Sequence, residues 1–184
     1  MKHKHSAHLF SALMLSAIVL FAVDVKAQAP FTTEFSSGVK VNLPIGTLKE
    51  TNTFGIGFDL QGEVPITRTF TAVGNVGLSF FLGRDSAEGT YDGESRGFIP
   101  FLAGVRYYVA NSFFIGGQAG YAMYQAGFLE GPSTGGFSYA PQIGFNGPKA
   151  GLYLFYNATK LSKETEVLPT GNMAHIGGSI LYRF

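Results

Sequence analysis

The sequence predicts an all-β fold, in which eight antiparallel strands close into an up-and-down transmembrane β-barrel. The first observation is the C-terminal segment, where Ile176, Ile180, Tyr182 and Phe184 alternate with small or polar residues. Apolar residues at every second position form one face of a strand. The second observation is that this alternation recurs in seven earlier segments. The third is that the connections between the segments are alternately long and short, as in membrane barrels.

Residues 1–27 have the composition of a secretory signal peptide. Two lysines precede a mostly apolar run over 9–23, and Ala27 offers a small residue at the expected cleavage site. The run of 15 residues is short for a membrane helix, and a retained helical anchor is the alternative interpretation. We therefore expect a signal peptide over 1–27 and one barrel domain over 28–184.

The composition limits the class of protein further. The chain has no Cys, so we expect neither a disulfide framework nor a lipid anchor at a cysteine. Three of the 13 Lys and Arg and one of the 12 Asp and Glu lie in residues 1–27, which leaves 10 basic and 11 acidic residues and a formal charge of about −1. Nothing in this balance indicates a nucleic-acid partner.

The first four expected strands follow the alternation in chain order. In residues 31–43 the odd positions are mostly apolar and the even positions are mostly polar, and residues 54–61 alternate apolar side chains with Gly, Asp and Gln. Residues 66–82 set Phe, Val and Leu opposite Thr, Asn and Ser. Arg68 breaks this pattern, and we expect it to extend toward a membrane interface. Residues 99–109 repeat the alternation and contain Arg106 on the more polar face.

The other four expected strands show the same period. Residues 113–123 and 137–145 place aromatic and β-branched side chains on one face and Gly, Gln, Ser or Ala on the other. Residues 151–157 have the least polar second face, and the C-terminal strand ends at Phe184. The aromatic and β-branched residues of these segments favour strands over helices.

The connections indicate how the strands are joined. Long polar segments are expected at residues 44–52, 83–97, 125–136 and 159–171, and short turns at 62–65, 110–112 and 146–149. An even-stranded barrel with both termini on the short-turn side requires this order. Strands of about 9–12 residues, rising about 3.3 Å per residue and tilted about 45°, span the apolar part of a membrane.

We expect the polar face of each strand to point into the barrel. The predicted lumen cluster consists of Glu34, Lys40, Asp59, Arg106, Gln118, Gln142 and Arg183, and Gln61, Asn157 and His175 share these faces. Glu34, Asp59, Arg106 and Arg183 are expected toward the short-turn end. An eight-stranded barrel is just wide enough for side chains to fill it, so these charges should pair with one another. A gated small pore is the alternative.

Few residues suggest chemistry. His175 is the only histidine after residue 27, and Ser179 lies about 13 Å farther along the same strand face, too far for a direct hydrogen bond. The carboxylates of residues 83–97 could bind Ca²⁺, but their spacing fits no defined calcium loop. We therefore expect no catalytic, metal or cofactor site.

On these residues the chain resembles the OmpA/OmpX-type family of small outer-membrane barrels, also described as porin-like. The resemblance rests on the signal peptide, the eight segments, stretches such as 101–108 and 113–121, and the terminal Ile180, Tyr182 and Phe184. It implies the outer membrane of a Gram-negative cell, contact with its lipid, and recognition of the C-terminal strand by the barrel-assembly machinery. Some family members carry a peptidoglycan-binding domain after the barrel, which is not expected here.

The predicted function follows from this resemblance and from the absence of a recognisable site. We expect a structural or surface-interaction role without catalysis, in which residues 83–97 and 125–136 reach a surface ligand. A narrow porin-like channel and a secreted, soluble, lipocalin-like barrel are the alternatives. The soluble barrel would bury the Phe-rich faces, and the sequence alone does not decide which faces point outward.

Overall fold

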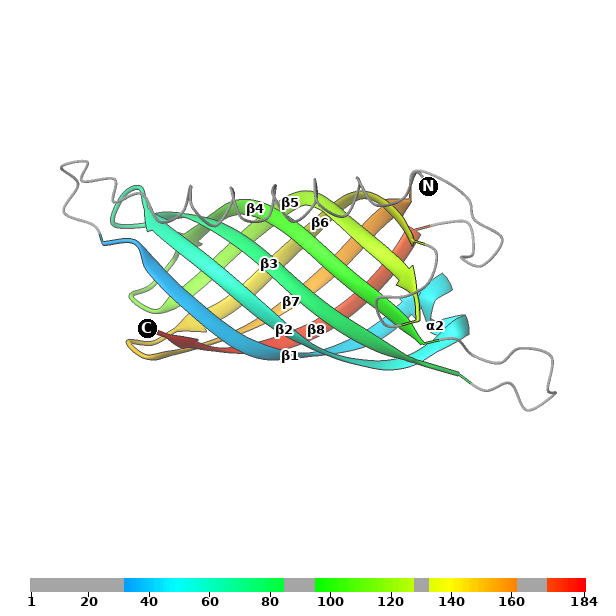
Figure 1. The fold of residues 1–184 in the computed structure, drawn as a ribbon. Coiled ribbons are helices and arrows are strands. Elements are labelled where there is room, and N and C mark those ends of the chain that lie inside the picture. The colour runs from blue at the N-terminus through cyan, green and yellow to red at the C-terminus, as the bar shows by residue number, and fades with distance from the viewer. Residues whose placement is uncertain (1–31, 85–94, 128–132, 162–171) are drawn as a thin grey trace, which may run out of the picture. The chain divides into compact units, whose positions relative to one another are not determined.

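The computed structural model describes residues 32–84, 95–127, 133–161 and 172–184 (Figure 1). The expected signal peptide over 1–27 lies outside the described residues, as do parts of three of the predicted long connections. The strands are β1 (Glu34–Gly46), β2 (Asn52–Pro65), β3 (Phe70–Gly83), β4 (Arg96–Tyr108), β5 (Phe113–Ala126), β6 (Ser133–Asn146), β7 (Ala150–Leu161) and β8 (Asn172–Arg183). One short helix, α2 (Thr47–Thr51), connects β1 to β2.

Each strand pairs antiparallel with the next one, and β8 pairs with β1 to close the barrel. The closing register runs from Ser36–Arg183 to Gly46–Met173. The predicted closed eight-stranded, up-and-down barrel is therefore confirmed. Among the described residues, no helix has the length and apolar character needed to cross a lipid bilayer.

The side chains divide as the alternation predicts, with the apolar face outside. Val39, Leu154 and Phe184 are 63%, 59% and 72% exposed, whereas Arg106 and Asp59 are 0% and 1% exposed. An exposed belt of large apolar residues around a buried ionic interior is the reverse of a soluble protein. It also opposes the lipocalin-like alternative, which requires the Phe-rich face to be buried.

Several predicted boundaries were wrong, because the strands extend beyond the visible alternation. The segment 62–65, predicted as a turn, belongs to β2, and Glu63 pairs with Val73 of β3. Residues 125 and 126 still belong to β5, and β6 already begins at residue 133. Small residues such as Gly135 and Gly136 hide the apolar period there, while cross-strand pairing continues through them.

Two more expectations need correction at the strand ends. Residues 47–51 form α2 instead of an irregular loop. Arg68, expected on the apolar face of a strand, lies exposed in the turn between β2 and β3, where the backbone amides of Ile66 and Thr67 both donate to the carbonyl of Phe70. The Thr67 hydroxyl accepts from the amide of Phe70 and stabilises this turn in place of a longer strand.

Two glycines on neighbouring strands have opposite surroundings. A Cβ built on Gly104, which faces the lumen, would overlap the carbonyl oxygen of Gly117 on the adjacent strand. A Cβ on Gly117 itself, which faces outward, meets nothing within 4 Å. We expect Gly104→Ala to cost about 1–3 kcal/mol of unfolding free energy through overpacking. Gly117→Ala should stay within about 0.5 kcal/mol of the parent.

Urea unfolding of both variants in lipid vesicles measures this difference. Because both substitutions add the same methyl group to neighbouring strands, a shared loss of glycine flexibility cancels in the comparison. Equal stability of the two variants would contradict the close approach of β4 and β5 on the lumen side.

Candidate functional site: the barrel lumen

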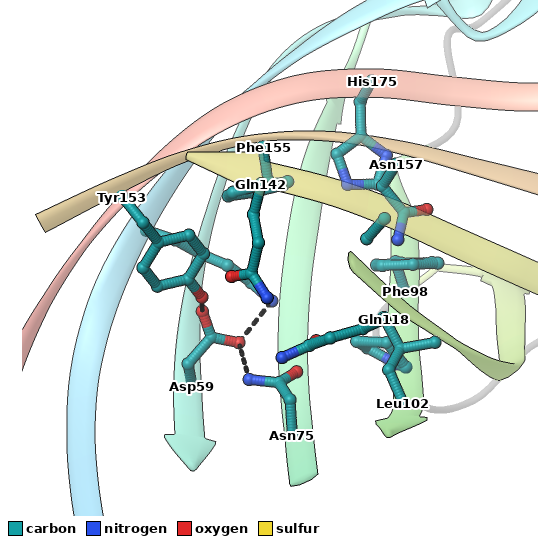
Figure 2. A pocket seen from close by; sticks show the side chains of 13 residues that line it. Asp59, Asn75, Phe98, Leu102, Gln118, Gln142, Tyr153, Phe155, Asn157 and His175 are labelled. Atoms are coloured by element: carbon teal, nitrogen blue, oxygen red, sulfur yellow. Dashed lines mark hydrogen bonds and ion pairs between the residues drawn. The ribbon is translucent and has the colours of Figure 1, made fainter. Parts of the chain in front are cut away.

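The middle of the lumen is organised around the carboxylate of Asp59 on β2. Lys40 of β1 donates to Asp59 Oδ1 at 2.8 Å, and both side chains are at most 4% exposed. Asn75 donates to the same oxygen at 3.3 Å, whereas the Tyr153 and Ser179 hydroxyls donate to Oδ2 at 2.8 and 3.3 Å. Figure 2 shows Tyr153 and Asn75 reaching Asp59 from different strands. We call these five residues the Asp59 network.

A second cluster lies nearer the short turns and is organised around Arg106 of β4. Its Nη1 donates to Glu63 Oε1, and its Nη2 donates to Gln61 Oε1 at 2.9 Å and Gln142 Oε1 at 3.2 Å. Glu63 Oε2 also accepts from Asn146 at 3.2 Å. We call these five residues the Arg106 network. Charge-assisted hydrogen bonds of this kind are stronger than neutral ones.

Aromatic rings support the buried guanidinium of Arg106. Its Cζ lies 4.3 Å from the ring centre of Phe114 and 5.4 Å from that of Tyr153. A cation over an aromatic face is attracted by the ring quadrupole, and more strongly when both are desolvated. Tyr153 therefore joins the two networks, because its hydroxyl donates to Asp59 and accepts from Gln61.

A third ion pair lies at the rim on the short-turn side. Arg183 Nη1 is 3.0 Å from Glu34 Oε2, and Arg183 Nη2 is 3.8 Å from Glu63 Oε2. The side chains of Arg183 and Glu34 are 19% and 41% exposed. Water screens this pair more than the two inner ones, so it contributes less to stability.

The predicted lumen cluster is thus brought together only in part. Lys40, Asp59, Arg106, Gln118 and Gln142 are buried inside the barrel, while Glu34 and Arg183 lie at its rim. Asp59 was expected toward the short turns, but it lies in mid-strand, opposite Gly38 and Gly77. Asp59 lies in mid-strand because β2 continues for six residues beyond it, to Pro65.

Sequence reasoning missed Glu63, the ion-pair partner of Arg106. It was assigned to a turn because Gly62 and Pro65 suggested that the strand had ended. The available signal was parity, since Glu63 follows Asp59 and Gln61 at intervals of two residues. Tyr153 was also not singled out, because an aromatic ring on a polar face gives no sign of the partners of its hydroxyl.

At the long-loop end, the lumen contains a buried apolar cluster together with buried polar side chains such as Arg96 and Asn52. Leu48 of α2, Phe81, Phe98, Ala122, Tyr124 and Met173 form a buried cluster, with Leu161 packed against it. We call this cluster the apolar layer. It was not predicted from the sequence, because Leu48 lies outside any alternating segment and the rings belong to the ends of different strands.

A small cavity separates the apolar layer from the Asp59 network. Its walls include Phe98, Gln118, Gln142, Phe155 and His175, and its volume is about 20 Å³. Figure 2 shows Phe98 and His175 on one side of this space and Asp59 and Asn75 on the other. A space of this size holds about one water molecule. The Nε2 atoms of Gln118 and Gln142 and the Nδ1 atom of His175 have no protein hydrogen-bond partner.

His175 and Ser179, the two residues considered for catalysis, both contact other groups in the lumen. The His175 ring packs edge-on against Phe81 and Phe98, with ring centres 5.2 and 5.0 Å away. The Ser179 hydroxyl bonds to Asp59 and to the Val39 carbonyl. Within the described ranges, no three His, Cys, Asp or Glu side chains are grouped as a metal site requires. The acidic residues at positions 85, 88, 92 and 94, which were considered above for Ca²⁺ binding, lie outside those ranges.

The C-terminal signature lies on the outer surface of β8 and at its end. Ile180, Tyr182 and Phe184 are 60%, 59% and 72% exposed, and the backbone amide of Phe184 donates to the carbonyl of Phe35 on β1. These side chains therefore face the medium around the barrel instead of the lumen. Arg183 lies between them in sequence and points the other way, toward Glu34.

Comparison with known proteins gives matches in structure but none in sequence. No family model and no curated protein matches the chain. Among solved structures, Ail of Yersinia pestis in complex with the heparin analogue sucrose octasulfate is similar at 16% identity and a TM-score of 0.60, covering 85% of this chain and all of Ail. Ail in a phospholipid bilayer nanodisc matches at 16% identity and a TM-score of 0.50, covering 83% of this chain and all of that one.

Neisserial surface protein A is a further similar structure. It has 9% identity and a TM-score of 0.53, and the match covers 85% of this chain and all of that protein. Identities this low establish the architecture and leave the activity open. The chain has the fold of the small, eight-stranded outer-membrane β-barrels.

Proposed function

We propose that the chain is an integral outer-membrane protein with a structural or surface-binding role, no catalysis and a lumen closed by its own side chains. The observation that carries this proposal is the exposed apolar belt around a barrel whose ionic groups are buried. Closure of the sheet leaves no unpaired strand edge, which a lipid environment requires. After removal of residues 1–27 the protein would reside in the outer membrane of a Gram-negative cell.

Membrane fractionation tests the first part of the proposal. The protein should remain in the outer-membrane fraction after carbonate washing, because its outward surface is apolar on all eight strands. It should also migrate faster on a gel when unboiled, since a closed barrel resists detergent. Release into the soluble fraction would instead support a secreted barrel, although the exposed belt argues against one.

Planar-bilayer recording tests the closed lumen. The parent protein should show no stable conductance, because Lys40, Arg106 and Glu63 are already paired inside a barrel whose central cavity has space for about one water molecule. Steady single-channel currents from the purified protein would favour the narrow porin-like channel. Currents lost on washing out detergent would not count for either function.

The surface-binding role would belong to residues 83–97 and 125–136, which include the connections from β3 to β4 and from β5 to β6. Ail, which has the same fold, was solved with a heparin analogue. For this chain the ligand class is open, so binding to sulfated glycans should be compared with binding to uncharged glycans. Loop-shortened variants that keep the strands intact are the matched controls. Insertion would use the barrel-assembly machinery, with Ile180, Tyr182 and Phe184 as its recognition signal.

A further inference from the structure

The two ends of the lumen are closed by different chemistry. At the long-loop end, Leu48, Phe98, Tyr124 and Met173 are at most 1% exposed and belong to the apolar layer. Nearer the short turns, the lumen contains the ionic Arg106 network instead. The members of the apolar layer come from α2, β3, β4, β5 and β8, so they surround the axis of the barrel instead of covering one wall.

Ring contacts connect this layer across the lumen. The ring centre of Phe98 lies 4.7 Å from that of Tyr124, 5.0 Å from that of His175 and 6.5 Å from that of Phe81. His175 also contacts Phe155, with ring centres 5.9 Å apart. Tilted and edge-on contacts at these separations are favourable for aromatic pairs. Phe98 is therefore the centre of a packed set that joins five strands.

Helix α2 places Leu48 on top of these rings. Gly46 turns the chain with a φ of 56°, a conformation that favours glycine. The amide of Arg84 donates to the Thr51 carbonyl at 2.9 Å, and the fully buried Asn52 donates to the Leu82 carbonyl at 3.3 Å. These bonds attach α2 to the end of β3 and hold Leu48 inward.

We propose that the apolar layer is a hydrophobic seal, which keeps aqueous ions out of the lumen cavity from the long-loop end. Phe98, His175, Lys40 and Asp59 all line the cavity, and Figure 2 shows Phe98 and His175 on the side away from Asp59. An ion that enters from the long-loop end must therefore cross the apolar layer before it meets Lys40 or Asp59. Apolar constrictions exclude ions because they do not hold water. The inference rests on the closed lumen proposed above.

The absence of Cys from the chain gives a direct test. Ala140 lines the cavity and is 6% exposed, so Ala140→Cys places one thiol there. The probe is Ag⁺, which is added to the protein in phospholipid nanodiscs. After denaturation, the thiols that have not bound Ag⁺ are labelled with maleimide, and the loss of labelling measures the reaction with Ag⁺. The thiol should react slowly in this parent and fast in Asn111→Cys, where the side chain is in an exposed turn.

Opening the apolar layer should then expose the cavity. In the Ala140→Cys parent, the pair of changes Leu48→Ala and Phe98→Ala should speed the reaction by about tenfold or more, because the lost side chains leave a wettable path. Lys49→Ala, on the exposed side of the same helix, should leave the rate unchanged. If the double variant loses its faster migration on unboiled gels, Leu48→Ala alone should still give about a threefold rise.

Each outcome bears on a separate claim. A fast reaction in the Ala140→Cys parent would refute the closed lumen and the seal with it. A slow parent with an equally slow double variant and an equally slow Leu48→Ala variant would refute only the seal, and the proposed membrane role would stand. An equal rise in the Lys49→Ala variant would show general loosening of α2, which also overturns the inference.

Discussion

Arg106→Met should lower the unfolding free energy by about 3–5 kcal/mol, because it leaves the buried carboxylate of Glu63 without its main partner. The guanidinium has 0% side-chain exposure, and the carboxylate has 4%. The change also removes the donor to the Oε1 atoms of Gln61 and Gln142. Arg183, at 3.8 Å from Glu63, compensates part of the charge, so the lower half of this range is expected.

The measurement is the urea concentration at which half of the protein is unfolded in lipid vesicles. The slope of the unfolding free energy against urea concentration should stay unchanged. Glu34→Gln is the matched control, since it breaks an ion pair whose acid is 41% exposed, and it should cost at most about 1 kcal/mol. Adding Glu63→Gln to Arg106→Met should restore much of the loss, because no unpaired charge remains. Equal costs for Arg106→Met and Glu34→Gln would mean that water reaches the Arg106 network.

The period of the side chains determined how much of this fold could be predicted. Strict alternation made the strands and their order visible, because the two faces of each strand meet different media. It could not show which medium lies outside, since a pattern and its inverse have the same period. Which face points outward becomes clear only in the closed barrel, where Lys40 and Asp59 pair inside the lumen and Val39 is exposed outside.

The site was less predictable than the fold because its contacts are between distant residues. Tyr153 and Asp59 are separated by 94 positions, and nothing local to either one indicates the other. The same holds for Leu48, whose burial depends on how α2 folds over the ends of β3, β4, β5 and β8. Glu63 could have been found, since it keeps the parity of Asp59 and needed only a longer strand. Pairing partners across a barrel require the register, which single segments do not specify.

Val41→Arg should cost about 2–4 kcal/mol in a bilayer, although Val41 is 50% exposed. Val41 lies on the outer face of β1, between Ile56 of β2 and Gly178 of β8, in the middle of the apolar belt. In a soluble barrel an exposed position of this kind tolerates charge within about 0.5 kcal/mol. In a membrane the guanidinium introduced at position 41 is surrounded by lipid. Its loss of hydration must be offset by extension of the side chain to the interface.

Val109→Arg is the matched control, because it makes the same change at a position of similar exposure. Val109 is 51% exposed and lies in the turn between β4 and β5, beyond the strand ends, where the cost should fall to about 0–1 kcal/mol. Urea unfolding in vesicles gives both values under the same conditions. Both variants lose a valine and gain the same charge, so the difference in their unfolding free energies reports the effect of depth in the bilayer. Equal and small costs would show that the belt meets water, and the membrane role would then fail while the barrel remained.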